Sequence, residues 1–200
     1  NEDDPLLRRV ARKFGNQVIW YSRIHQEAML LRKHLKIPGE HNVSNALAAL
    51  HLGRLFGVDE AQILRTLSSY SGAWRRFEFK GILNGAYLIS DYAHHPNEIR
   101  ATIAATRQRY PFRRIWCVYQ PHQKRRTEYL WDDFIGAFDY ADRVTMLPIY
   151  DVAGRETESA SHTRTSPALV KELIRRGKDA LYISSVKSAK THLCRHTRMG

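Results

Sequence analysis

The chain has 200 residues and a mass of 23.3 kDa, with 43% hydrophobic and 26% charged residues. This composition indicates one large globular domain or two small ones, and it excludes collagen, coiled coils and wholesale disorder. No apolar run approaches the roughly 18 residues of a membrane span, and no signal-peptide pattern is present. We therefore expect a soluble, cytoplasmic protein without a membrane partner. The net charge of +12 suits nucleic acid or a substrate with several phosphates, and composition does not choose between them.

The first 73 residues are mainly helical by pattern. Acidic residues and a proline open a helix that ends before Gly15, and an Ala- and Leu-rich segment ends at Gly57, a typical left-handed helix cap. The expected elements are a helix over Pro5–Phe14, a buried strand over Gln17–Tyr21, an ambiguous segment over 24–36, and helices over Asn42–Phe56 and 59–71.

The predicted structure changes near Trp74 from helices to strands alternating with helices, so we place a domain boundary there and expect domains 1–73 and 74–200. Asn84-Gly85 between two apolar runs predicts a β-hairpin. Strands and helices then alternate, which predicts an α/β fold: a small Rossmann-like domain with a mainly parallel sheet covered on both faces. The expected elements are helices from Pro96, over Glu128–Phe138 and over Ser166–Ile174, and strands over Arg114–Tyr119, Val144–Ile149 and Ala180–Ser184.

Three loops that follow these strands carry chemically active side chains. In a parallel sheet such loops lie at one edge, where ligands bind, and helix N-termini add positive potential. We therefore expect this edge to bind an anion. The loops are Asp91–Pro96, Gln120–Thr127 and Tyr150–Glu156.

Each of these features also has a plainer reading. His94 and His95 can simply cap the following helix, and Lys124–Arg126 can be a solvated surface. His192, Cys194 and His196 resemble a metal-binding set, but they stand in a basic tail from Val186 to which we assign no regular structure and no role, so no metal site is predicted. The two cysteines, 77 residues apart, are read as buried thiols.

Several catalytic signatures are absent from the 200 residues. No Gly-x-x-x-x-Gly-Lys-Ser/Thr loop occurs, no Gly-x-Gly-x-x-Gly follows a strand, and no nucleophile elbow is present. A complete nucleotide-using active site is therefore not encoded in this sequence.

Four segments, in one order along the chain, resemble motifs of the Mur ligases of peptidoglycan synthesis: Gly39–Ala49, Gly72–Glu78, Asp91–Ile99, and Gln120–His122 with Arg126-Thr127. Within the family, the resemblance is greatest to the members that join L-alanine to UDP-N-acetylmuramic acid. It implies that residues 1–73 are the end of the central ATPase domain, that 74–200 are the Rossmann-like C-terminal domain, and that the chain is a fragment.

The resemblance implies a function in cell-wall synthesis, and hence in cell shape and division. ATP and Mg²⁺ would be cofactors, with the P-loop and the magnesium ligands upstream of this chain, so that the chain alone is inactive. UDP-N-acetylmuramic acid and L-alanine would be the partners, with no nucleic acid among them. The lactyl carboxylate would be phosphorylated, and the amine of L-alanine would attack the acyl phosphate.

The resemblance also implies roles for the nucleotide-facing residues. Asn42 and Asn45 match an Asn pair that faces adenine; three residues apart on one helix, their amides share a face. Arg76 and Asp91 match residues near the ribose and phosphates of ATP.

The amino-acid side of the site is implied in the same way. Tyr92, His94 and His122 match residues that line the alanine side chain, and Arg126 matches a carboxylate clamp, a role suited to a planar guanidinium. His94, His122 and Arg126 are the candidate catalytic residues. One position departs from the family pattern: Gln123 stands where other members have a second Arg, and Lys124 or Arg125 would have to compensate.

Two alternatives stay open. A recycling ligase of the same family attaches an intact tripeptide to the same sugar and would need a roomier pocket beyond His94 and His122. A basic interaction or nucleic-acid-binding module would instead bind generic DNA with an affinity that falls steeply with salt.

Overall fold

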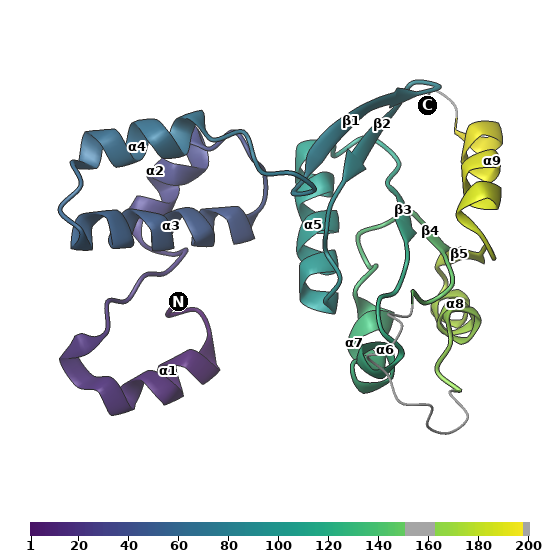
Figure 1. The fold of residues 1–200 in the computed structure, drawn as a ribbon, viewed down its shortest axis with the longest axis horizontal. Coiled ribbons are helices and arrows are strands. Elements are labelled where there is room, and N and C mark those ends of the chain that lie inside the picture. Colours follow the sequence, from purple (N-terminus) through teal and green to yellow (C-terminus); the bar gives the residue numbers. More distant parts are fainter. Residues whose placement is uncertain (151–162, 198–200) are drawn as a thin grey trace. The chain divides into compact units, whose positions relative to one another are not determined.

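The computed structural model describes residues 1–150 and 163–197, which form two compact units, Asn1–Ala73 and Trp74–Gly200. Figure 1 shows the helices and strands of both units. No helix in the described ranges is both long and apolar enough to cross a membrane.

The first unit is helical throughout its regular structure. Asp4 caps the first helix, since its side chain accepts from the main-chain N–H of Leu6 and Leu7. Gly57 ends the longest helix with a φ of +71°, as its position predicts. The elements are α1 (Pro5–Ala11), a 3₁₀ segment η1 (Arg12–Gln17), α2 (Gln26–His34), α3 (Glu40–Leu55) and α4 (Glu60–Ser69). Their buried core consists of Ala28, Leu31, Val43, Ala46, Leu47, Leu50 and Ile63.

The strand expected over Gln17–Tyr21 does not form. Its β-prone residues have no partner strand among the described residues of this unit, and Ile19 is 51% exposed. The main-chain bond from Glu2 N to Tyr21 O and the stacking of the Tyr21 ring on His51 hold the segment instead. The ambiguous segment over 24–36 folds instead as helix α2.

The second unit begins with the predicted hairpin. Strands β1 (Glu78–Leu83) and β2 (Ala86–Ser90) pair antiparallel around Asn84 and Gly85. Both turn residues have positive φ, 49° and 82°, which is why Asn-Gly is favoured in this tight turn.

The α/β prediction for the rest of the unit is confirmed. Three strands pair parallel in the order β3-β4-β5, and helices connect them. The helix expected over Glu128–Phe138 is instead two short helices that meet at Leu130, whose ψ of 28° interrupts the helical path. The elements are α5 (Pro96–Arg109), β3 (Trp116–Tyr119), α6 (Lys124–Tyr129), α7 (Trp131–Gly136), β4 (Arg143–Met146), α8 (Ser166–Arg175), β5 (Asp179–Tyr182) and α9 (Val186–His196).

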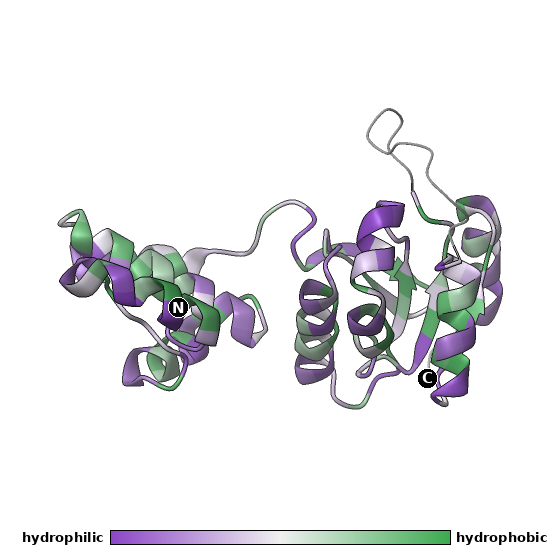
Figure 2. Ribbon diagram, turned by 90° about the horizontal axis from the view of Figure 1, so that it is seen from below, coloured by the Kyte–Doolittle hydropathy of each residue, from purple (hydrophilic) through white to green (hydrophobic). Residues whose placement is uncertain are grey.

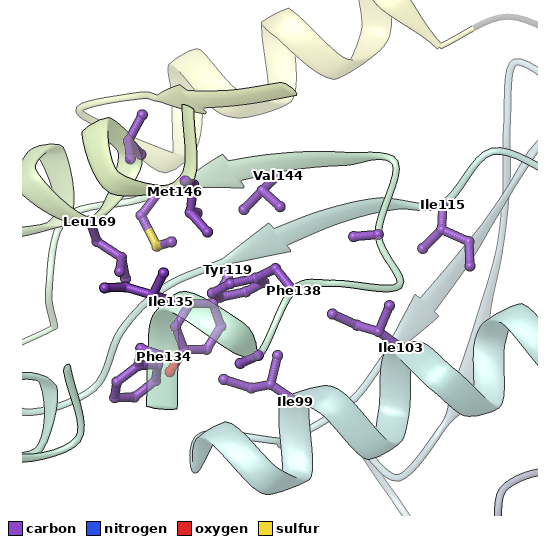
Figure 3. Packing of buried hydrophobic residues seen from close by; sticks show 14 residues of the cluster. Ile99, Ile103, Ile115, Tyr119, Phe134, Ile135, Phe138, Val144, Met146 and Leu169 are labelled. Atoms are coloured by element: carbon purple, nitrogen blue, oxygen red, sulfur yellow. The ribbon is translucent and has the colours of Figure 1, made fainter. Parts of the chain in front are cut away.

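Helices α5, α7 and α8 share one core against one face of the sheet. Figure 3 shows Ile99 and Ile103 of α5 directed toward Tyr119 and Phe138, with Met146 of β4 beyond them. Phe138 and Met146 are fully buried, so truncating either would leave a cavity. In Figure 2 the hydrophobic residues of this unit gather on the strands, between helices whose outer faces are hydrophilic.

The opposite face of the sheet packs against α9, which corrects the prediction of an irregular tail. Ser185 caps this helix through the N–H of Ser188. Because strand side chains alternate, Trp116 and Thr145 point away from the main core; Trp116 Nε1 donates to Thr145 Oγ1 at 2.7 Å, and His192 of α9 meets the indole edge-on. The unit is therefore a helix–sheet–helix sandwich.

Candidate functional site

The loop from β2 to α5 is built around the carboxylate of Asp91. Its Oδ2 accepts from the N–H of Phe77 and its Oδ1 from the N–H of Ala93, both at 2.8 Å. Asp91 therefore joins the segment before β1 to the loop after β2, and this shapes the loop that carries Tyr92 and His94. The N–H of Tyr92 bonds in addition to Arg75 O at 2.7 Å.

The two adjacent histidines of this loop have different roles. His95 is the helix cap of α5, since its Nδ1 accepts from the N–H of Asn97 at 3.3 Å. His94 caps nothing: its Nδ1 lies 3.0 Å from the carbonyl oxygen of Tyr92 and 3.5 Å from a carboxylate oxygen of Glu98. The capping interpretation thus holds for His95 and leaves the imidazole of His94 available.

Glu98 closes the capping box of α5 from inside the helix. Its Oε2 accepts from the N–H of His94 at 3.0 Å and of His95 at 3.2 Å. Burial raises the pKa of Glu98, but these two N–H groups and the positive charges of His94 and Arg76 outweigh it, so the net pKa is lowered. Glu98 is therefore an anion at neutral pH, directly beside His94.

The segment after β3 carries His122 in a loop and Arg126 in the short helix α6 that follows it. Pro121 O accepts from Tyr150 N at 2.7 Å and Tyr150 O from Gln123 N at 3.0 Å, so a parallel bridge pairs His122 with Tyr150 and their rings lie 5.3 Å apart. Gln123 has a φ of +72°, which a non-glycine residue adopts at a cost of about 1–2 kcal/mol. Strain of this kind concentrates at functional loops.

Arg126 has a buried nitrogen without a partner. Within the described ranges, no group accepts a hydrogen bond from its Nη1, although that atom is removed from solvent. Leaving a buried charged donor unsatisfied is costly, so this nitrogen fits an anion that the described residues do not supply. A carboxylate matches the planar guanidinium.

Tyr119, at the end of β3, connects the two loops. Its hydroxyl donates to the main-chain oxygen of His94 at 3.3 Å. Burial raises the pKa of Tyr119, and the charges of Arg126 and Glu98 both act on its phenol, so both lie within electrostatic reach of it. The structure thus brings the loop of His94 and the loop of Arg126 to one edge of the sheet.

Three residues of this edge were not among the sequence-predicted site residues: Arg75, Glu98 and Tyr119. The guanidinium of Arg75 lies 4.7 Å from the ring centroid of Tyr92, a cation–π contact. Glu98 could have been found, because a Glu three residues after a helix cap is the capping-box signal. Neither Arg75 nor Tyr119 has a comparable local signal.

The remaining predicted residues are placed separately. Arg76 is exposed, and its charge acts on Glu98. Asn42 and Asn45 belong to the first unit, on helix α3, where Asn42 Nδ2 donates to Pro38 O at 2.6 Å and Asn45 is exposed. Of the loop Tyr150–Glu156, only Tyr150 lies within the described residues.

A groove of about 490 Å³ lies beside this edge, between β2, α5, β3 and the end of α9. Of the predicted site residues only Asp91 is in its lining, so the groove is not the pocket expected for the amino acid. It separates β2 from β3, which belong to different sheets.

The described residues contain no group of three or more His, Cys, Asp or Glu side chains that could hold a metal ion. His192 and His196 stack on one face of α9 with ring centroids 4.1 Å apart. Cys194 is exposed on this helix, so the prediction of a buried thiol is wrong there, and it does not complete a ligand set among the described residues.

Comparison with known proteins identifies relatives of this chain. Residues 75–200 match the family model of the Mur ligase glutamate ligase domain. The chain is 41% identical over 166 residues to the UDP-N-acetylmuramate–L-alanine ligase of Caldanaerobacter subterraneus subsp. tengcongensis, covering 83% of this chain and 35% of that protein. It is 45% identical over 132 residues to the ligase of the same name from Clostridium perfringens, covering 66% and 28%. The chain thus spans about a third of the length of these relatives.

Solved structures give the same result for the fold. The UDP-N-acetylmuramate–alanine ligase of Thermotoga maritima superposes with a TM-score of 0.62 at 28% identity, covering 78% of this chain and 32% of that one. A murein peptide ligase of Psychrobacter arcticus superposes with a TM-score of 0.55 at 23% identity, covering 83% and 33%.

Proposed function

The chain belongs to the Mur ligase family, and on that basis we propose that it forms the amino-acid-binding part of an enzyme that joins L-alanine to UDP-N-acetylmuramic acid with consumption of ATP. The observation that supports the proposal is the buried Nη1 of Arg126, which has no hydrogen-bond partner in the described part of the chain. Tyr119 links it to the loop of His94, since the charge of Arg126 acts on the Tyr119 phenol and the hydroxyl bonds to His94 O. An amino acid brings a carboxylate, the anion that such a guanidinium binds best.

Arg126 then holds the α-carboxylate of L-alanine and directs its amine toward the sugar. The amine attacks the carbonyl carbon of the acyl phosphate, a tetrahedral intermediate forms, and inorganic phosphate leaves. His94 and His122 border the amino acid, with Tyr92 beside them. Fixing the amine against its electrophile removes most of the entropic barrier of this step.

The nucleotide end of the site is assigned to other residues. Arg76 is exposed and its charge reaches Glu98 in the loop of the site, which fits a role with the phosphates of ATP. Both carboxylate oxygens of Asp91 accept hydrogen bonds from main-chain N–H groups, so its role is to shape the loop near the ribose. Asn42 retains its amide oxygen, and Asn45 its whole amide, for the adenine edge.

Magnesium is assigned to the rest of the enzyme. The described residues offer no acidic cluster for it, and we propose that its ligands and the P-loop are supplied by the part of the longer protein that this chain does not include. Bound there, Mg²⁺ would neutralise charge on the phosphates.

The test is a chimaeric enzyme in which this chain replaces the matching segment of the Caldanaerobacter ligase. We expect ATP- and UDP-N-acetylmuramate-dependent phosphate release with L-alanine. The tripeptide L-Ala-γ-D-Glu-meso-diaminopimelate, offered in parallel, is expected to give little. Preference for the tripeptide would refute the alanine assignment, and an isolated chain that binds duplex DNA instead would refute the ligase reading.

A further inference from the structure

The surroundings of His94 fix the tautomer of its imidazole ring. Both groups at its Nδ1, the carbonyl oxygen of Tyr92 at 3.0 Å and the carboxylate of Glu98 at 3.5 Å, are acceptors only. Nδ1 must therefore carry the hydrogen. In the neutral ring the lone pair then lies on Nε2, for which no partner is recorded among the described residues.

The main chain of His94 is fixed as firmly as its ring. Its N–H donates to Glu98 and its carbonyl accepts from Tyr119, so helix α5 and strand β3 both hold the residue. A side chain with a third of its surface exposed thus has a defined position and one free basic nitrogen.

We propose that Glu98 is a positioning residue that makes Nε2 of His94 the proton acceptor for the incoming amino acid; this rests on the proposed function. An amino acid arrives mainly as an ammonium ion, which cannot attack an acyl phosphate. One N–H bond of the ammonium breaks, its electron pair stays on the nitrogen, and the proton moves to Nε2. The resulting imidazolium is stabilised by the anionic Glu98 on its other side.

Glu98 also caps α5, and the test must separate the two roles. Glu98→Gln keeps an oxygen that accepts from the N–H of His94 and His95 but removes the negative charge. Asn97→Ala, on the same helical turn and with its side chain bonded to Arg100, is the matched control. Circular dichroism and thermal unfolding of both variants check that α5 is intact.

The first measurement is made on the 200-residue chain and needs no activity. Long-range ¹H–¹⁵N spectra of the histidine rings, assigned with a His94→Gln variant, report the tautomer of His94 at alkaline pH. We expect the Nδ1–H tautomer. The Nε2–H tautomer overturns the proposal whatever the enzyme assay shows.

The second measurement uses the chimaeric ligase. We expect Glu98→Gln to lower kcat about 100-fold, the lower end of general-base effects, with little change in the KM for L-alanine, and Asn97→Ala to leave both unchanged. An unchanged kcat in Glu98→Gln overturns the positioning role. If the parent chimaera uses neither L-alanine nor the tripeptide, the proposed function fails, and the tautomer still decides the geometry of His94.

Discussion

The hydroxyl of Tyr119 donates to the main-chain oxygen of His94 at 3.3 Å, across 25 residues of sequence. Through this bond, a residue of the buried core directly supports the loop of the candidate site. Tyr119 packs at the same time against Phe134 and Phe138, with ring centroids 6.1 and 5.6 Å away.

Replacing Tyr119 by Phe should therefore cost one buried hydrogen bond and no packing. We expect the free energy of unfolding to fall by about 1 kcal/mol, measured by urea denaturation. Tyr129→Phe is the control, because Tyr129 is 87% exposed and should give no change. Equal midpoints for the two variants would show that the bond does not contribute to stability.

Arg126→Ala should weaken amino-acid binding more than it affects turnover. Loss of a buried, charge-assisted contact costs about 2–4 kcal/mol, so we expect the KM for L-alanine in the chimaeric ligase to rise about 30- to 1,000-fold. Arg126→Lys should recover only part of this, because an ammonium cannot bind a carboxylate with two parallel N–H groups. An exposed arginine at the C-terminal end of α5 serves as the control: Arg109→Ala should change the KM less than threefold. A parental KM in Arg126→Ala would refute the clamp.

Asp142 should make the stability of the second unit depend on pH. Burial raises the pKa of Asp142, but the N–H of Ile115 at 2.6 Å and the guanidinium of Arg107 outweigh it, so the folded-state pKa lies below the unfolded value of about 3.9. Its stabilisation is therefore present above that unfolded pKa and is lost as the pH falls through the folded pKa.

The matched variant is Asp142→Asn. We expect it to be less stable than the parent by about 1 kcal/mol at neutral pH, a modest value because the side chain is half-exposed and screened. Urea unfolding at neutral pH and near pH 3 should show that difference shrinking in acid. A difference that does not depend on pH would show that the carboxylate charge contributes nothing.

The two thiols should differ in reactivity. Burial raises the pKa of Cys117 to about 12, whereas Cys194 is exposed on α9. With a disulfide reagent at pH 8, we expect one fast thiol in the folded chain and two in denaturant. Cys194→Ser should remove the fast phase, and its persistence would place the reactive thiol at Cys117 instead.

Local signals in the sequence were sufficient wherever the chain itself determines the conformation. The Asn84-Gly85 turn and the Pro96 helix start follow from backbone preferences of a few residues, and the structure confirms both. The prediction of a strand over Gln17–Tyr21 is wrong because a strand needs a partner strand to pair with, and no local pattern reveals whether one is present.

The C-terminal helix shows the opposite error. Ser185 is a good helix cap, and Val186, Ala189 and Leu193 have helical spacing, but the segment does not resemble the final helix of the family, which suggested an irregular tail. What fixes α9 is contact with the sheet, such as His192 against Trp116, and such contacts are not encoded locally.

The candidate site also has features that the sequence predicts and features that only the structure shows. Residue types and their place after strands predicted that His94 and Arg126 belong to one edge. Three further features could be read only from the structure: the bond from Tyr119, the carboxylate of Glu98 at Nδ1 of His94, and the buried Nη1 of Arg126 that no described residue satisfies.

Nη1 of Arg126, which is buried without a hydrogen-bond acceptor among residues 1–150 and 163–197, implies that stability is given up for ligand binding. An apolar side chain of similar length at this position would remove the unsatisfied charge from the ligand-free chain. Arg126→Met should therefore unfold at a higher temperature than the parent. L-Alanine should raise the unfolding temperature of the parent, because it pairs with Arg126, and should not raise that of Arg126→Met.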